Sequence, residues 1–221
     1  MKRVGGRALR GGVIMFSDDR VGVAIRMSET EVSVRGRSVD LRERWWIVVP
    51  VLRGILSMFE AIIAGSSVTV RDLYPVTGVS YWIRYALNPR AYLDMLRFHG
   101  AEHMTIAAHD SGLPLTVENV RGQSRLTPRC GTVTAAFVLL MYGLVALLLP
   151  VGIGEGWRVF ALVGTMVMSV GVAHELARIA TRVRGMMFLV WPGMILQLVT
   201  TQRPGDSHIE VAIAALNESL R

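Results

Sequence analysis

The stretch GTVTAAFVLLMYGLVALLLP, from Gly131 to Pro150, contains no charged residue over its whole length. As a helix it is about long enough to cross the roughly 30 Å of hydrocarbon in a bilayer. A second apolar stretch, Trp157 to Leu176, has its only ionisable groups near its ends, and the connection Val151 to Gly156 is short. Two such antiparallel helices satisfy their backbone hydrogen bonds internally in lipid. The sequence therefore predicts a transmembrane helical hairpin, which we place at residues 131–178.

The composition of the 221 residues agrees with a membrane protein. The mean hydropathy of +0.42 is high for a soluble domain. The net charge of +7 comes almost wholly from arginine. The arginines nearest the hairpin gather at its two feet: Arg121, Arg125, Arg129, Arg178, Arg182 and Arg184. By the positive-inside rule both feet are cytoplasmic, which predicts a multi-pass protein of the cell membrane with cytoplasmic N- and C-termini.

The same charge distribution limits the choice of partners. A basic protein of this kind contacts the lipid bilayer, whose inner leaflet is anionic. We expect no nucleic-acid partner, because the sequence has no groove-reading motif and no basic stripe interleaved with aromatic residues. Other membrane proteins, or a second copy of this chain, remain open as partners.

Short segments rich in β-branched residues precede the hairpin. Val13 to Phe16, Val21 to Met27 and Glu31 to Arg35 are separated by polar turns, which predicts a small cytoplasmic antiparallel sheet within residues 1–44. Further along, Leu113 to Val120 alternates imperfectly between apolar and polar residues and predicts one more strand.

An apolar segment with two charges lies within residues 45–70. Trp45 to Ala64 carries Arg53 and Glu60, and each charge would cost about 2.5 to 3.5 kcal/mol at the centre of a bilayer. We therefore expect both side chains to face protein or water and to line a polar groove. The segment either spans the membrane or enters and leaves on one side. A re-entrant or interfacial helix keeps the basic flanks together, which favours that arrangement.

The residues that could carry chemistry lie in a cytoplasmic segment, residues 71–130. Asn88-Pro89 is typical of a helix start and Gly112 of a helix end, so the stretch His99-Gly100-Ala101-Glu102-His103 falls in mid-helix. Positions separated by three and four residues share one helix face. The order His-x-x-Glu-His is the inverted zincin pattern, in which both histidines bind zinc and the glutamate is the general base.

A zinc site needs at least one ligand more than this helix supplies. In a symmetric hairpin Cys130 and Glu175 would share the cytoplasmic mouth, and we expect one of them to be the third ligand. Cys130 is the only cysteine, which excludes an internal disulfide and fits a reduced compartment. Each of these residues, taken singly, is also typical of a purely structural role.

The C-terminal part, residues 179–221, contains two further elements. Met186 to Thr201 is uncharged but holds Pro192-Gly193 and is short for a span, so we expect it to lie in the membrane interface. Asp206 to Leu220 predicts an amphipathic cytoplasmic helix. The predicted fold class is thus an α-helical integral membrane protein with a small antiparallel β-sheet, an α+β chain whose hairpin is joined by re-entrant or interfacial helices.

Several stretches of the sequence resemble the YqhQ family. They are Phe98-His99-Gly100-Ala101-Glu102-His103, Leu113-Pro114-Leu115-Thr116-Val117-Glu118-Asn119-Val120, Pro128-Arg129-Cys130-Gly131-Thr132 and Ile209-Glu210-Val211-Ala212-Ile213-Ala214. Gly5-Gly6, Pro192-Gly193 and Thr200-Thr201 fit the same family. The resemblance implies a bacterial integral-membrane domain that is described as a predicted metal-dependent enzyme with no settled substrate.

Two functions follow from these observations. The first is a zinc-dependent hydrolase at the cytoplasmic membrane face, with His99 and His103 as ligands, Glu102 as general base, and a peptide or lipid ester as substrate. The second is a non-enzymatic membrane chaperone, insertion factor or assembly scaffold. In that case Arg53 and Glu60 would form the groove that holds client helices or lipid.

Overall fold

The structure, a computed structural model, describes residues 2, 4–28, 30–38, 48–59, 88–150, 152–183 and 185–221. The chain divides into two compact units, which we describe separately. The first unit comprises Met1–Glu43, Thr69–Leu126 and Val199–Arg221, and the second comprises Arg44–Val68 and Thr127–Leu198.

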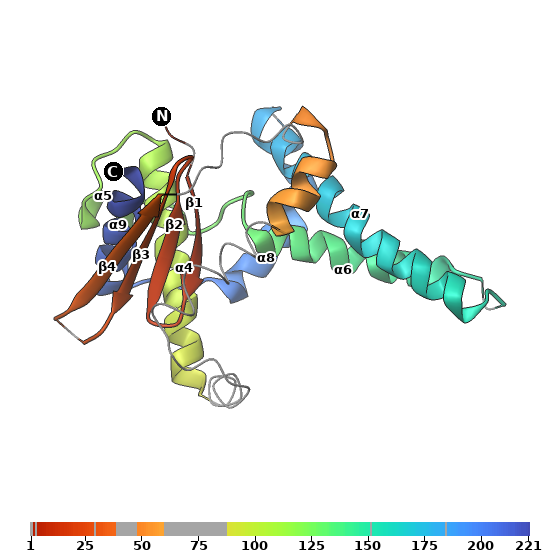
Figure 1. Ribbon diagram of the computed structural model, residues 1–221, viewed down its shortest axis with the longest axis horizontal. Helices are drawn as coiled ribbons and strands as arrows, with labels where there is room; N and C mark the ends of the chain where they lie inside the picture. The colour runs from red at the N-terminus through yellow and green to blue at the C-terminus, as the bar shows by residue number, and fades with distance from the viewer. Residues whose placement is uncertain are drawn as a thin grey trace. The chain divides into compact units, whose positions relative to one another are not determined.

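The first unit contains a four-stranded antiparallel sheet in the order β1-β2-β3-β4 (Figure 1). The strands are β1 (Gly5–Leu9), β2 (Gly12–Phe16), β3 (Arg20–Arg26) and β4 (Val32–Ser38). The predicted sheet is confirmed, but the sequence did not predict β1. Its Gly5-Gly6 start has low strand propensity. The strand forms through pairing with β2, across a turn in which Gly11 has a φ of 73°.

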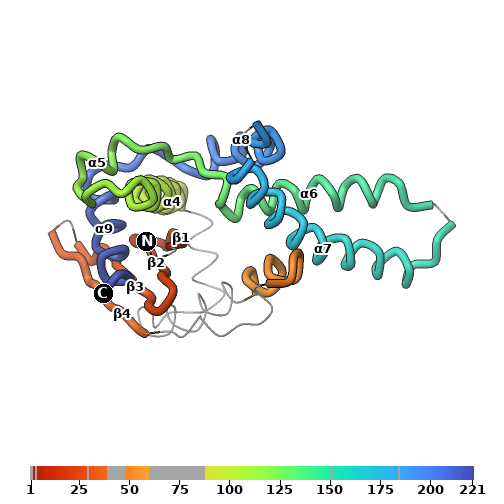
Figure 2. Tube along the Cα trace, turned by 90° about the horizontal axis from the view of Figure 1, so that it is seen from above, coloured from red at the N-terminus to blue at the C-terminus, as the bar shows by residue number. Residues whose placement is uncertain are grey.

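Side chains of the sheet alternate between two buried clusters, as the pleat requires. Val13, Met15 and Ala24 face a cluster formed with two helices, whereas Ile14 and Val23 belong to a second cluster. The helices are α4 (Pro89–Asp110) and α9 (Asp206–Leu220), and they cover the same face of the sheet (Figure 2). Each fully buried large side chain of this core contributes about 1.5–3 kcal/mol.

Helix α9 packs closely on the sheet because two glycines face each other across β3 and β4. Gly22 pairs with Gly36, and a Cβ atom on Gly22 would overlap the carbonyl oxygen of Ala215. The helix predicted at residues 206–220 is confirmed. However, it belongs to the unit of the sheet, whereas the sequence placed it in one segment with the residues from 179 onward.

The strand predicted at residues 113–120 is wrong. The chain forms the short helix α5 (Val117–Arg121) instead. The hydroxyl oxygen of Thr116 accepts a hydrogen bond from the backbone N–H of Asn119 at 3.3 Å, which is an N-cap. This local cap outweighs the weak alternation of apolar and polar residues.

The second unit contains two long helices, α6 (Gly131–Leu148) and α7 (Glu155–Arg182), which form a helical hairpin as predicted. Both are long and apolar enough to cross a membrane. A 3₁₀ turn, η2 (Met186–Val190), leads into α8 (Trp191–Thr200), whose Pro192 lies in the first turn, where proline is tolerated. The second unit ends at Leu198, within α8.

The Gly22–Gly36 pair leads to a prediction about stability. Gly22→Ala should lower the free energy of unfolding by about 1–3 kcal/mol, because the new methyl group overpacks the contact with α9. Gly5→Ala is the matched control, since a Cβ there meets nothing within 4 Å. Denaturant unfolding in detergent measures both. Equal stability of the two variants would contradict the close approach of α9.

Candidate functional site

Helix α4 carries the histidine pair, and its ends agree with the prediction. The Asn88 side chain caps the N-terminus by accepting a hydrogen bond from the N–H of Ala91 at 3.2 Å, and Pro89 is the first helical residue. At the other end, Gly112 has a φ of 69°, the left-handed conformation that follows many helices. His99, Glu102 and His103 therefore lie in mid-helix, about two turns or more from either end.

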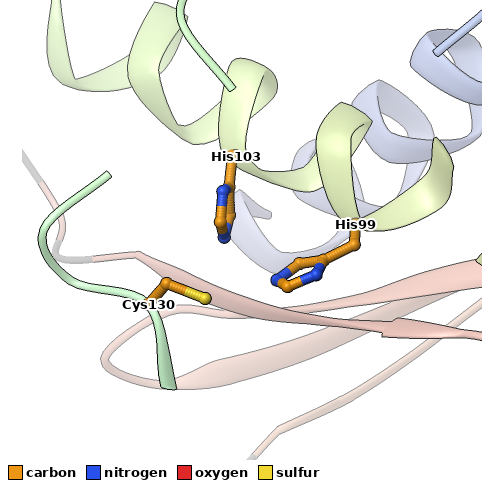
Figure 3. A group of neighbouring side chains, drawn as sticks. All are labelled: His99, His103 and Cys130. Carbon is orange, nitrogen blue, oxygen red and sulfur yellow. The ribbon is translucent and has the colours of Figure 1, made fainter. Parts of the chain in front are cut away.

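The two imidazole rings lie beside each other on successive turns of α4. Their centroids are 4.5 Å apart and their planes meet at 68°. One ligand nitrogen of each ring lies within 4.8 Å of the other. Figure 3 shows both rings, together with the side chain of Cys130 from the start of α6. The i, i+4 spacing thus brings the two histidines together as predicted.

Backbone carbonyls fix the orientation of both rings. Nδ1 of His99 lies 2.9 Å from the carbonyl oxygen of Thr200, and Nδ1 of His103 lies 2.6 Å from that of Arg125. A carbonyl oxygen only accepts hydrogen bonds, so each neutral ring carries its proton on Nδ1. Each Nε2 is then the nitrogen with the lone pair. Histidines that bind metals typically hold the other ring nitrogen in this way.

Glu102 lies between the two histidines in sequence and packs against β1. Its side chain is 5% exposed, and a Cβ on Gly6 would lie 2.7 Å from its Cγ. Among the described residues, no hydrogen-bond partner is found for its Oε2. Burial raises the pKa of Glu102 to about 7, against the opposing effects of His99, a backbone hydrogen bond from Ala8, and Arg7. The carboxyl group is therefore readily protonated near neutral pH.

The segment 200–202 lies directly against the histidine helix. The backbone N–H of Gln202 donates to the carbonyl oxygen of Leu96 at 2.9 Å. Gly100 permits this approach, because a Cβ on it would overlap the carbonyl oxygen of Gln202. Arg125 donates from its guanidinium group to the carbonyl oxygen of Thr201. Sequence reasoning missed these contacts, since they involve main-chain carbonyls that any residue type supplies.

Cys130 belongs to the second unit, where it caps α6. Its Sγ accepts hydrogen bonds from the backbone N–H of Thr132 at 3.5 Å and from the hydroxyl of Thr132 at 3.2 Å. The preceding loop is held by Gln197, which is fully buried on α8. Its amide accepts from the N–H of Thr127 at 2.9 Å and donates to the carbonyl of Thr127 at 2.7 Å. The position of the thiol at the start of α6 is thus well defined within its unit.

Glu175, the other predicted ligand, is engaged elsewhere in the second unit. Its carboxylate forms an ion pair with Arg53, and Nε of Arg53 donates to Oε1 at 2.6 Å. Arg178 lies 3.8 Å away, one turn further along α7. The sequence predicts that Arg53 lines a polar groove with Glu60, which lies outside the described residues. A carboxylate so neutralised is a poorer metal ligand.

The fold and the site together define a class of protein. It is a mixed α+β chain with two helices of membrane-spanning length and a pair of ordered imidazoles beside a buried carboxyl group. The chain belongs to the family described as protein of unknown function (DUF1385), whose model matches residues 79–221. This match, together with the relative described next, confirms the predicted resemblance to the YqhQ family.

One relative shows how much of the chain is shared. The uncharacterized protein YqhQ of Bacillus subtilis (strain 168) is 40% identical over 178 residues, which cover 79% of this chain and 55% of that protein. The chain therefore spans about half the length of this curated relative. No solved structure matches the chain.

Burial of Glu102 predicts that stability depends on pH. The pKa is about 7 in the folded chain against 4.5 for a free glutamate, so the folded state binds the proton more tightly. This stabilisation is fully present below about pH 4.5 and is lost as the pH rises through about 7, by about 3 kcal/mol at most. Glu102→Gln should remove this loss, whereas the exposed Glu118→Gln should not. The free energy of unfolding of chelator-treated protein, measured across this pH range, tests the prediction. If that free energy depends on pH in Glu102→Gln as it does in the wild type, the buried carboxyl group is not the cause.

Proposed function

We propose that this chain is a zinc-dependent integral-membrane enzyme, a hydrolase that acts at the cytoplasmic face of the membrane. The observation that supports it best is the arrangement of His99 and His103. Both rings hold Nδ1 against a carbonyl oxygen, and both therefore present the lone pair of Nε2 on one helix face. This is the orientation in which imidazole binds zinc.

The donor set suits zinc better than a harder cation. His99, His103 and Cys130 each offer one ligand atom, and zinc prefers nitrogen and thiolate sulfur, whereas magnesium and calcium prefer oxygen. We propose Cys130 as third ligand because of the chain connection. The carbonyl of Arg125 contacts His103, and the five residues from Arg125 to Cys130 span at most about 18 Å. The thiol can therefore reach the histidines.

Glu102 is the general base of this proposal. Zinc, when bound, supplies a Lewis acid that polarises a carbonyl group or lowers the pKa of water. The carboxyl group of Glu102 has a pKa of about 7, and its Oε2 has no hydrogen-bond partner in the part of the chain that the structure describes, which suits it to accept a proton near neutral pH. The residue is 5% exposed and its Oε2 is buried, so the proposal requires that a water molecule reach this oxygen. A general base needs only that contact.

The bilayer is the proposed environment of the hairpin. Only 6% of the apolar window of α6 and 22% of that of α7 are buried inside the protein, whereas a core helix of a soluble domain is mostly buried. The arginines at both feet of the hairpin support cytoplasmic termini by the positive-inside rule. We propose a multi-pass protein of the bacterial inner membrane, with peptide or lipid ester as the substrate class.

A non-enzymatic scaffold is the second proposal, and one observation favours it. The faces of α6 and α7 form an open groove lined by Phe137, Met141, Phe160, Gly164 and Met168, among others. Such a groove could hold the apolar face of a client helix. The polar alternative is less favourable, because Arg53 is paired with Glu175 and not directed at a client.

The zinc proposal predicts about one metal ion per chain in protein purified without chelator or metal-binding tag. His99→Ala and His103→Ala should each abolish binding, because the chelate needs both rings, while Glu102→Gln should retain the metal. His109→Ala, on the last turn of the same helix, is the matched control and should also retain it. Elemental analysis measures the metal content of all four variants. Stoichiometric metal in the double variant His99→Ala/His103→Ala would refute the site.

The proposed topology predicts which residues react with an impermeant thiol reagent. In a Cys130→Ser background, a cysteine in place of Gly154 should be labelled from outside the cell. Cysteines in place of Ser28, Ser111 and Ser207 should be labelled only after permeabilisation. All four positions are exposed, so accessibility does not limit the reaction. Labelling at Ser207 in intact cells would refute a cytoplasmic C-terminus.

A further inference from the structure

Arg125 contacts both parts of the chain that hold the histidine rings. Its own carbonyl oxygen lies 2.6 Å from Nδ1 of His103. Its guanidinium group donates to the carbonyl oxygen of Thr201, the residue after the one that holds His99. The side chain is half-buried between these two segments. One residue is thus connected to the orientation of both imidazoles, through its backbone in one case and through its side chain in the other.

The guanidinium acts on His99 through a single peptide unit. The carbonyl of Thr201 and the N–H of Gln202 belong to the same planar peptide. Arg125 holds the oxygen of this peptide, and the carbonyl of Leu96 accepts from its N–H at 2.9 Å. With both ends fixed, only the two backbone dihedrals of Thr201 remain to direct the carbonyl of Thr200. That carbonyl is the acceptor for Nδ1 of His99 at 2.9 Å.

We infer that Arg125 is a positioning residue of the histidine pair, whose side chain keeps the carbonyl of Thr200 on Nδ1 of His99 and so holds Nε2 ready for metal. The expected effect on metal affinity rests on the proposed zinc site, but the tautomer of the His99 ring is measurable without metal. A partner that orients a ligating histidine typically changes metal affinity 10–100-fold when it is removed.

An electrostatic role and a positioning role of Arg125 predict opposite changes in zinc affinity when its side chain is removed. A guanidinium beside a cation site repels the metal, so removing it should tighten binding if charge were its only effect. If Arg125 positions His99, removing it should weaken binding. The direction of the change in zinc affinity therefore separates the two roles.

Arg125→Met tests the inference, because methionine keeps an unbranched stem and has no donor, while the backbone carbonyl that holds His103 is retained. In metal-free protein, two-bond proton–nitrogen correlation spectra of the histidine rings report the tautomers. We expect His99 to lose its preference for a protonated Nδ1 and His103 to keep it. Zinc affinity should fall about 10–100-fold. Arg125→Lys, which restores a donor, should recover part of both effects.

The matched control is Arg121→Met, since Arg121 lies four residues earlier and pairs with Asp206 on the surface. It removes the same charge and should change neither tautomer nor affinity. If Arg125→Met does not fold, the His99 tautomer of Arg125→Lys is compared with that of the wild type. The lysine side chain is shorter than the arginine side chain, so we still expect a shift of the tautomer. An unchanged tautomer with unchanged or tighter zinc binding would overturn the inference. Absence of zinc from the wild type, with the tautomer shift present, would refute the proposed function and leave the role of Arg125 standing.

Discussion

The close approach of segment 200–202 to helix α4 is the constraint on which the site depends. It requires that position 100 have no side chain, because a Cβ on Gly100 would overlap the carbonyl oxygen of Gln202. With the segment in contact, the N–H of Gln202 bonds to the carbonyl of Leu96 and the carbonyl of Thr200 meets His99. Gly100, in the His-Gly-Ala-Glu-His stretch, is therefore as important for the geometry as the two histidines are.

Glycines also permit close approach where helices meet the sheet. Gly6 leaves room for the side chain of Glu102, and the Gly22–Gly36 pair leaves room for α9. In each case a helix or its side chain lies closer to a neighbouring backbone than a Cβ would permit. Glycine in a strand costs up to about 1 kcal/mol in conformational entropy. Denser packing of the apolar cluster around Phe98 and Leu216, both fully buried, offsets that cost.

The parts of the fold that local sequence signals determine were predictable. The cap at Asn88-Pro89, the alternation in β2 and β3 and the uncharged run of α6 each depend on neighbouring residues only. Strand β1 was not predictable from Gly5-Gly6, because it exists through pairing with β2. Helix α5 was mistaken for a strand because its cap at Thr116 competes with a weak alternation.

The site itself was only half predictable, for a related reason. The i, i+4 spacing of the histidines places them together whatever the rest of the chain does. Their acceptors are carbonyls 101 and 22 residues away in sequence, and a carbonyl has no sequence signature. The ion pair of Arg53 with Glu175 joins residues 122 apart. The sequence predicts only that Arg53 and Glu60 line a common groove, and tertiary structure reveals the distant partner.

A purely structural pair of histidines would use the same two carbonyl contacts, so these contacts alone do not imply metal. The difference lies at the other nitrogen. With Nδ1 of both neutral rings protonated, both Nε2 atoms carry the lone pair, and one ligand nitrogen of each ring lies within 4.8 Å of the other. Lone pairs so placed repel each other weakly, and a cation converts this repulsion into attraction. A zinc ligand pair requires two such lone pairs, whereas a structural role does not.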